Sequence, residues 1–396
     1  MAREAGYVGA MYPWQSGSDG REESQRVHLN PLSGRWLPDT SHLQRHVGLT
    51  VAYSIWQYYQ ATGDLAFLAE HGAEVLLEIT RFWASLACYD PARDRYHIRG
   101  VMGPDEYSTR YPGATEPGID DNAYTNVMAV WALLRAQDVL AVLPSTRRTE
   151  LVESLGLGPA ELLHWREVSQ RMYVPIGADG VINQFEGYRD LPELDWDSYR
   201  RRYGDIQRLD RILEAEGRSV DDYQASKQAD VLMLFYLLSA DELRELLGRL
   251  GYALPPEAIP RTIEYYLART AHGSTLSVLV HGWVLARANR EQALEHFERA
   301  LRSDIADIQR HHHRGRAPGG DGRVRGPAAA LFRGAGNPAG RAVVQPALAA
   351  TVRPAHVRRA VPGSAVDRPG RWSRGAGIRR ARTRRRGPGR LRGRGP

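Results

Sequence analysis

The sequence has one cysteine among its 396 residues. Cys88 therefore has no partner within the chain, which excludes an intramolecular disulfide. Its place in the apolar stretch RFWASLACY predicts a buried structural thiol rather than a nucleophile. The chain also lacks an apolar run of transmembrane length, and its first residues, MAREAGYVGAMYPW, lack the apolar core of a signal peptide. These absences predict a cytoplasmic protein with no membrane partner.

Several common motifs for cofactors and metals are missing. The chain contains no G-x-G-x-x-G, no Walker loop, no H-E-x-x-H and no paired C-x-x-C. The sequence therefore predicts neither a resident cofactor nor a metal centre.

Acidic residues are almost absent from residues 310–396. This stretch has 22 arginines, no lysine and two aspartates, so it carries a charge of +20, whereas residues 1–309 carry −13. Arg, Gly, Pro and Ala make up 62 of its 87 residues without helical or strand periodicity, which predicts a disordered tail. Two interpretations are open: an arm that binds RNA or DNA through phosphates, or the out-of-frame product of a GC-rich gene. The acidic body argues against a nucleic-acid partner.

Residues 42–304 show the apolar spacing of helices joined by short polar loops. Asp64 is a predicted N-cap. Some segments are apolar nearly all round, which predicts burial on two sides. Two β-like pieces, 94–102 and 179–185, lie in the loops, and the helical pairs suggest an α/α toroid. The predicted helices cover residues 42–63, 64–89, 122–143, 158–172, 226–239, 240–250, 260–270 and 274–288.

Carboxylates gather between residues 99 and 126. A Gly-Pro turn leads directly into Asp105 and Glu106, and a second pair, Asp120 and Asp121, precedes a helix. These acids could form a solvated loop, a metal site or the proton donor of a reaction. Their spacing departs from the EF-hand pattern, which disfavours calcium, and we expect Asp120 and Asp121 to cap the helix.

The stretch RYHIRGVMGPDEY…DDNAYTNVMA resembles the catalytic region of glycoside hydrolase family 65, which contains maltose, trehalose and kojibiose phosphorylases and hydrolytic relatives. GAMYPWQSGSDGREES, WQYYQATGD, SKQADVLML and RTAHGSTLS match in the same order, so the resemblance spans roughly residues 2–309. The family fold is an (α/α)6 barrel between an N-terminal β-sandwich and a small C-terminal β domain. The resemblance thus implies an all-α chain: a partial (α/α)6 barrel over residues 1–309, incomplete at its N-terminus, and a disordered tail over 310–396.

The resemblance also assigns roles. Glu106 matches the general acid, which protonates the leaving oxygen as an oxocarbenium-like transition state forms. Asp105 is a candidate modulator of its pKa, although a turn residue after the proline is an equally good interpretation. Lys227 and Gln228 match the pair that holds the hydroxyls of the glucosyl unit. Two interpretations of His46 are open: it lines the side of the substrate site that holds the acceptor sugar, or it is an ordinary core histidine.

The phosphate loop implied by the resemblance is HGSTLS. The loop supplies the imidazole of His272, the hydroxyls of Ser274 and Thr275, and a glycine, Gly273, that permits close approach to the backbone. It also begins a helix, whose N-terminal amides favour an anion. A capped helix start is an equally valid description of the same residues.

The implied function is inverting phosphorolysis of an α-glucoside, such as kojibiose, trehalose or maltose, to β-glucose 1-phosphate and a sugar. The partners would be the disaccharide and inorganic phosphate as co-substrate, with no cofactor or metal, and a homodimer is compatible with the resemblance. An inverting hydrolase on the same scaffold is the alternative. The segment VHLNPLSGRWLPDTSHLQRH departs from the best-known maltose and trehalose phosphorylases, so the substrate stays open.

Both ends depart from the family pattern. After SDIADIQ the family continues with a Gly-Gly-Thr-Thr-x-Glu-Gly-x-His-Leu-Gly motif, whereas this chain reads RHHHRGRAPGGDG. One possible choice of codons for that segment encodes the family motif when it is read one base later. We therefore predict that residues 310–396 are a frameshift product. The β-sandwich, the first barrel helices and a Phe-Trp-Asp-Thr segment are missing at the N-terminus. We therefore expect this polypeptide to be inactive or poorly folded.

Overall fold

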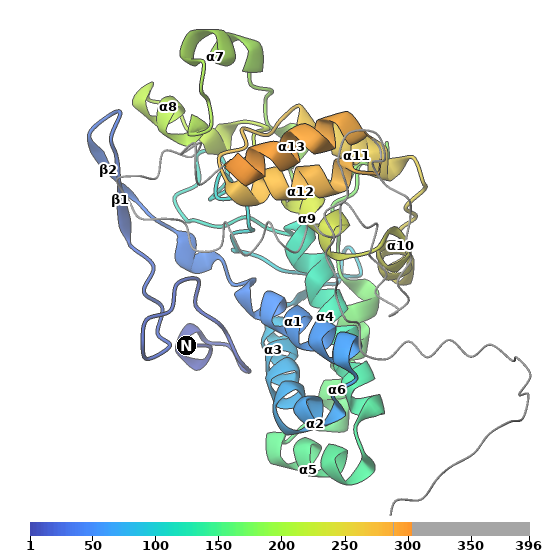
Figure 1. The fold of residues 1–396 in the computed structure, drawn as a ribbon. Helices are drawn as coiled ribbons and strands as arrows, with labels where there is room; N and C mark the ends of the chain where they lie inside the picture. The colour runs from blue at the N-terminus through green and yellow to red at the C-terminus, as the bar shows by residue number, and fades with distance from the viewer. Residues whose placement is uncertain (288, 303–396) are drawn as a thin grey trace, which may run out of the picture. The chain divides into compact units, whose positions relative to one another are not determined.

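The computed structural model describes residues 1–287 and 289–302, and this part of the chain is mostly helical (Figure 1). The predictions made for residues 310–396, including the boundary at 309/310, lie outside the described residues. The helices are α1 Val47–Thr62, α2 Leu65–Phe67, α3 Ala73–Leu86, α4 Ala123–Val142, α5 Ser145–Leu155, α6 Pro159–Arg171, α7 Trp196–Tyr203, α8 Leu209–Ala215, α9 Asp230–Leu237, α10 Ala240–Arg249, α11 Ala258–Leu267, α12 Thr275–Leu285 and α13 Arg290–Arg302. Short 3-10 turns lie at Arg3–Ala5, Ser41–Leu43, Tyr188–Asp190 and Val220–Asp222, and a π turn at Leu68–Gly72.

The prediction of an all-α chain is wrong in one respect, because two small antiparallel hairpins are present. Strands β1 Val27–Asn30 and β2 Arg35–Pro38 form the first, and β3 Cys88–Asp90 and β4 Arg95–His97 form the second. The β-like piece at 94–102 thus contains β4, whereas the piece at 179–185 contributes only an isolated bridge.

Helix α4 forms the centre of the core. It packs against α1, α3, α6 and α9, and most of its first fourteen residues are buried. This confirms that segments which are apolar all round are buried on more than one side. Within the described residues, no helix is both long enough and apolar enough to span a bilayer.

Helix boundaries follow local side-chain chemistry. Asp64 accepts a hydrogen bond from the Phe67 N–H at 2.9 Å, which confirms the predicted cap. The predicted capping by Asp120 and Asp121 is wrong: Asn122, which directly precedes α4, accepts the Thr125 N–H at 2.9 Å.

Cys88 is exposed, so the predicted buried thiol is also wrong. Helix α3 ends at Leu86 because Ala87 adopts an extended conformation, and the chain then enters β3. Cys88 therefore leaves the apolar face that its position in the sequence suggested.

We expect Leu133→Ala, a substitution of a fully buried residue at the centre of α4, to lower the free energy of unfolding by about 2–5 kcal/mol through the cavity it leaves. Leu163→Ala in α6 is the matched control, because this leucine is 53% exposed and its truncation should change stability by about 0.5 kcal/mol or less. Urea unfolding followed by circular dichroism measures both. Equal losses for the two variants would contradict the central place of α4.

Candidate functional site

The predicted acid lies on a loop between β4 and α4 that is fixed on both sides of Glu106. The Asp105 N–H donates to Asp230 Oδ1 at 2.6 Å, and the Tyr107 N–H donates to Asp105 Oδ1 at 3.1 Å. Gly103 is needed here, because a Cβ at this position would overlap the Asp230 carboxylate and the Asn122 amide. The loop therefore presents Glu106 from a rigid base.

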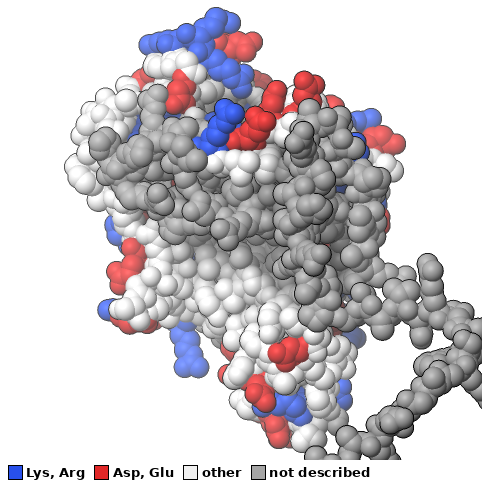
Figure 2. Space-filling model, in the orientation of Figure 1, with Lys and Arg blue, Asp and Glu red and all other residues white. Residues whose placement is uncertain are grey.

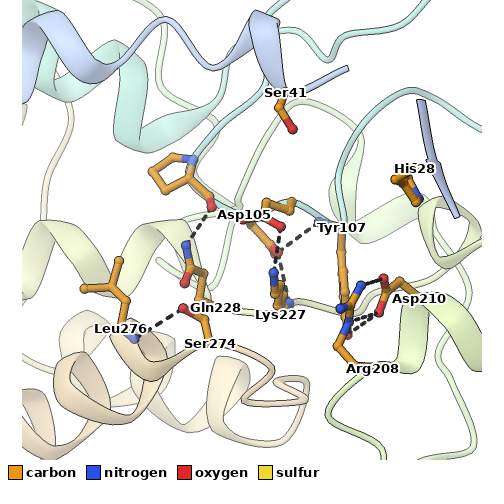
Figure 3. A network of polar contacts seen from close by, with 12 residues as sticks. His28, Ser41, Asp105, Tyr107, Arg208, Asp210, Lys227, Gln228, Ser274 and Leu276 are labelled. Carbon is orange, nitrogen blue, oxygen red and sulfur yellow. Dashed lines mark hydrogen bonds and ion pairs between the residues drawn. The ribbon is translucent and has the colours of Figure 1, made fainter. Parts of the chain in front are cut away.

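The structure brings Glu106 together with the pair predicted to hold the glucosyl unit. Figure 3 shows Lys227 and Gln228 beside Asp105, the residue that precedes Glu106. Lys227 Nζ lies 2.6 Å from Glu106 Oε2, and the Lys227 N–H donates to Asp105 Oδ1 at 2.9 Å. Gln228 Nε2 donates to the Pro104 carbonyl at 2.7 Å, while its Oε1 has no hydrogen-bond partner among the described residues. Glu106 is 41% exposed and Lys227 13%, so the contact lies where the loop meets solvent.

Asp105 is fully buried, and its carboxyl is directed at the protein. Besides the N–H groups of Tyr107 and Lys227, it accepts a hydrogen bond from Gln184 Nε2 at 2.8 Å. Burial raises the pKa of Asp105 to about 7. Burial also raises the pKa of Asp230 well above its usual range, and the nearby charge of Asp105 adds to this effect.

The predicted phosphate loop packs against the segment that carries Lys227. The Ser226 N–H donates to the Arg269 carbonyl at 2.9 Å, and the Ala271 N–H donates back to the Ser226 carbonyl at 2.8 Å. Gly273 is required, because a Cβ would overlap the Gln207 carbonyl and approach Lys227 Cγ to 3.0 Å. The loop and the Lys227 segment therefore form one continuous surface.

The start of α12 is capped within this loop. Ser274 Oγ accepts the Leu276 N–H at 3.2 Å, and Thr275 is the first helical residue. His272 has a φ of +55°, a left-handed conformation that is uncommon outside glycine and is found at functional sites. Its Nδ1 lies 2.9 Å from Ser277 Oγ.

Three histidines pack together behind this loop. The ring centroids of His272, His281 and His296 lie 4.5 to 5.7 Å apart. Burial lowers the pKa of His272 well below its usual value, that of His281 to about 3 and that of His296 to about 4. All three are therefore neutral at pH 7, and the loop offers an anion N–H and O–H donors rather than an imidazolium.

A cavity of about 390 Å³ opens beside His272. Arg200 and Arg299 line it together with the acid Asp205 and with Gln207. The cavity therefore places two guanidinium groups and one carboxylate next to the predicted phosphate loop.

Sequence reasoning missed several residues that hold the site together. Three of them contact the loop of Glu106 or the Lys227 segment: Gln184, Asn122 and Asp230. A fourth, Arg208, forms hydrogen bonds of 3.0 and 2.5 Å to Asp210 (Figure 3). Only Asp230, an acid at the start of a strongly apolar helix, left a signal in the sequence. Gln184 lies in a loop whose local pattern reveals nothing about its partners.

The remaining acids of the opening region do not converge on a metal. Asp121 Oδ2 lies 2.7 Å from His97 Nδ1, and Asp120 accepts the Gly100 N–H at 3.1 Å. Among residues 1–287 and 289–302, no cluster of three or more His, Cys, Asp or Glu could hold a metal ion. The acids instead tie the loop to β4.

His46 lies buried between aromatic rings. Its ring centroid is 5.5 Å from that of Trp14 and 6.0 Å from that of Tyr124, and burial lowers its pKa to about 4. The neighbouring Leu43 carbonyl accepts the Met102 N–H at 3.1 Å, so this segment adjoins the loop of Glu106. Both interpretations of His46, acceptor side or core, are compatible with this position.

Comparisons with known proteins agree on one family. The model of the glycosyl hydrolase family 65 central catalytic domain matches residues 1–316. An uncharacterized glycosyl hydrolase of Mycobacterium tuberculosis is 64% identical over 78% of this chain and 23% of its own length. Trehalose 6-phosphate phosphorylase of Lactococcus lactis is 44% identical over 78% of this chain and 38% of its own length.

A solved structure shows a similar fold. A human-microbiome protein whose name marks it only as a candidate kojibiose phosphorylase aligns with a TM-score of 0.67 and 22% identity, over 84% of this chain and 41% of its own. The chain thus spans between about a quarter and two fifths of the length of these proteins.

The buried histidines predict a defined pH response. Because their folded-state pKa values lie below the ordinary value of 6.5, the unfolded chain binds more protons between pH 6.5 and about 4, and stability falls as the pH falls. The raised pKa of Asp105 acts in the opposite direction between about pH 4 and 7. We expect His296→Phe to reduce the loss of unfolding free energy between pH 7 and pH 4 by on the order of 1–2 kcal/mol.

The measurement is urea unfolding at a series of pH values. His71→Phe, at an exposed position outside the cluster, is the control and should leave the pH dependence as it is in the parent chain. An unchanged slope for His296→Phe would show that this histidine is not held neutral by burial.

Proposed function

Because the chain belongs to glycoside hydrolase family 65, we propose that it carries the centre of an inverting disaccharide phosphorylase. The reaction is cleavage of an α-glucoside by inorganic phosphate to β-glucose 1-phosphate and a sugar. The observation that carries the proposal is the contact of Glu106 with Lys227 directly beside the loop of His272 to Thr275. In this proposal the described helices belong to an (α/α)6 barrel.

In the proposed mechanism, Glu106 gives its proton to the glycosidic oxygen as the bond to the anomeric carbon breaks. A phosphate oxygen attacks that carbon from the opposite face, so the configuration inverts. Phosphate is itself the nucleophile, so the site needs donors to hold it rather than a second carboxylate. The donors are His272, the hydroxyls of Ser274 and Thr275, and the first N–H groups of α12, with Arg200 and Arg299 supplying positive charge nearby.

Lys227 has two partners in this scheme. With no sugar present its ammonium lies 2.6 Å from Glu106 Oε2. A sugar that binds Lys227 would draw this ammonium away and leave Glu106 free to give its proton to the glycosidic oxygen. A hydroxyl of the glucosyl unit is the natural competitor for Nζ, and the unpartnered Oε1 of Gln228 can accept a second hydroxyl.

The disaccharide remains to be identified by assay. The similarity to trehalose 6-phosphate phosphorylase adds trehalose 6-phosphate to kojibiose, trehalose, maltose and nigerose as test substrates. An acceptor that carries a phosphate would be compatible with the two arginines that line the cavity beside His272, Arg200 and Arg299.

The alternatives make different demands. A hydrolase of the same family would use water and so would not require phosphate. A nucleic-acid-binding role would rest on residues 310–396, which lie outside the described residues. Residues 1–309 carry −13, and on the face shown in Figure 2 basic side chains lie next to acidic ones. A phosphate-dependent reaction is therefore the function that the site supports best.

In a version of the chain whose reading frame is restored, we expect glucose 1-phosphate to form from one of these five disaccharides only when phosphate is supplied, and Glu106→Gln to lower kcat about 100- to 10,000-fold, because the proton donor is lost. Glu116→Gln, an exposed acid on the same loop, is the matched control and should retain activity. Chromatography of glucose and glucose 1-phosphate measures the products. Glucose released at the same rate without phosphate would identify a hydrolase instead.

The assay is made on this chain and on a version whose reading frame is restored at codon 310. The predicted frameshift is tested separately by the nucleotide sequence of the gene. The family motif should appear one base out of frame, whereas unrelated codons there would refute the frameshift.

A further inference from the structure

Two buried carboxyls join the loop of Glu106 to the segment of Lys227 in a reciprocal way. Asp230 Oδ1 accepts the N–H of Asp105 at 2.6 Å, and Asp105 Oδ1 accepts the N–H of Lys227 at 2.9 Å. Each carboxyl thus holds the backbone of the other's segment. Because Asp105 also accepts the N–H of Tyr107, the residues on both sides of Glu106 are held in place.

A buried glutamine links the Asp105 carboxyl to the backbone of Asp230. Gln184 Nε2 donates to Asp105 Oδ2 at 2.8 Å, and Gln184 Oε1 accepts the Asp230 N–H at 3.3 Å. Asn122, the cap of α4, donates from Nδ2 to Asp230 Oδ2 at 2.6 Å. All four side chains are completely buried. We call Asp105, Asn122, Gln184 and Asp230 the buried clasp.

The clasp is a costly arrangement for stability alone. Removing two carboxyls from water is unfavourable unless hydrogen bonds compensate, and apolar side chains of similar volume often serve a core as well or better. Within the clasp, Asp105 directly precedes the predicted acid Glu106, and Asp230 follows Lys227 by three residues. Glu106 Oε2 and Lys227 Nζ are 2.6 Å apart. Holding two side chains from distant segments at that separation is a task that buried hydrogen bonds of fixed geometry perform well.

We propose that Asp230 and Gln184 are positioning residues that set the placement of Glu106 relative to Lys227. The proposal rests on the proposed function for its catalytic consequence, but the clasp itself is a property of the fold. The phosphate loop is attached separately through Ser226, Arg269 and Ala271. Loss of the clasp should therefore lower kcat and leave the KM for phosphate nearly unchanged.

The decisive variant is Asp230→Asn, which keeps the side-chain shape and turns an acceptor facing Asn122 Nδ2 into a donor. We expect kcat to fall roughly 10- to 100-fold, as for a misplacement of about 1 Å, with the KM for phosphate changed less than about twofold. The double variant Asn122→Asp with Asp230→Asn restores a donor–acceptor pair at these positions, but it removes the hydrogen bond of Asn122 Nδ2 to the Gln184 carbonyl, so it should recover part of the loss. Asp241→Asn, an exposed acid at the start of α10, is the control.

Hydrogen exchange with mass spectrometry tests the clasp without any activity. In Asp230→Asn we expect amide exchange to speed up at least tenfold in residues 103–108 and 226–229, and to stay as in the parent in residues 127–133 of α4. The double variant should return both segments toward parent rates.

The outcomes separate the two proposals. Unchanged exchange in both segments, or an equal rise throughout the chain, would overturn the clasp. Faster exchange confined to these two segments, with kcat unchanged, would overturn the positioning role of the clasp. If the version with the restored reading frame is inactive while exchange responds locally, the proposed function fails and the clasp stands as a feature of the fold.

Discussion

A buried carboxyl must receive hydrogen bonds, and in this chain that requirement joins segments more than a hundred residues apart in sequence. Asp105 and Asp230 are both buried, and each accepts one hydrogen bond from the backbone of the other's segment. The loop of Glu106 is therefore tied to the segment of Lys227. The predicted acid and the predicted sugar-holding pair inherit their arrangement from these bonds.

Charge in the site is controlled by burial. Burial keeps the histidines behind the predicted phosphate loop neutral, and Arg200 and Arg299 line the cavity beside it. Lys227 is paired with Glu106, so its charge becomes available to a ligand only when that contact opens. In the proposed reaction an anion would meet the arginines and N–H donors on one side of the site, and a sugar would meet a cation that has to change partners on the other.

The sequence predicted most of the fold that depends on local pattern. The periodic segments became α1, α4 and α12, and Asp64 caps where expected. The errors lie where one residue decides between two local structures: Asn122 caps in place of the acids before it, and an extended Ala87 turns Cys88 outward. Helices α5 and α7 were missed because their sequences are mainly polar and carry little apolar periodicity. Helix α8 was missed because it has only 7 residues, although Leu209, Ile212 and Leu213 have helical spacing.

The site shows the same division. Glu106, Lys227 and His272 could be found because they occur in motifs, and the structure brings their segments together. Gln184 could not be found, since nothing near it in sequence indicates that both ends of its amide contact buried aspartates. Residues that touch a ligand are restricted in type and leave short patterns. Residues that hold them in place are restricted only by geometry in the folded chain, so their role becomes visible when the distant segments are seen in contact.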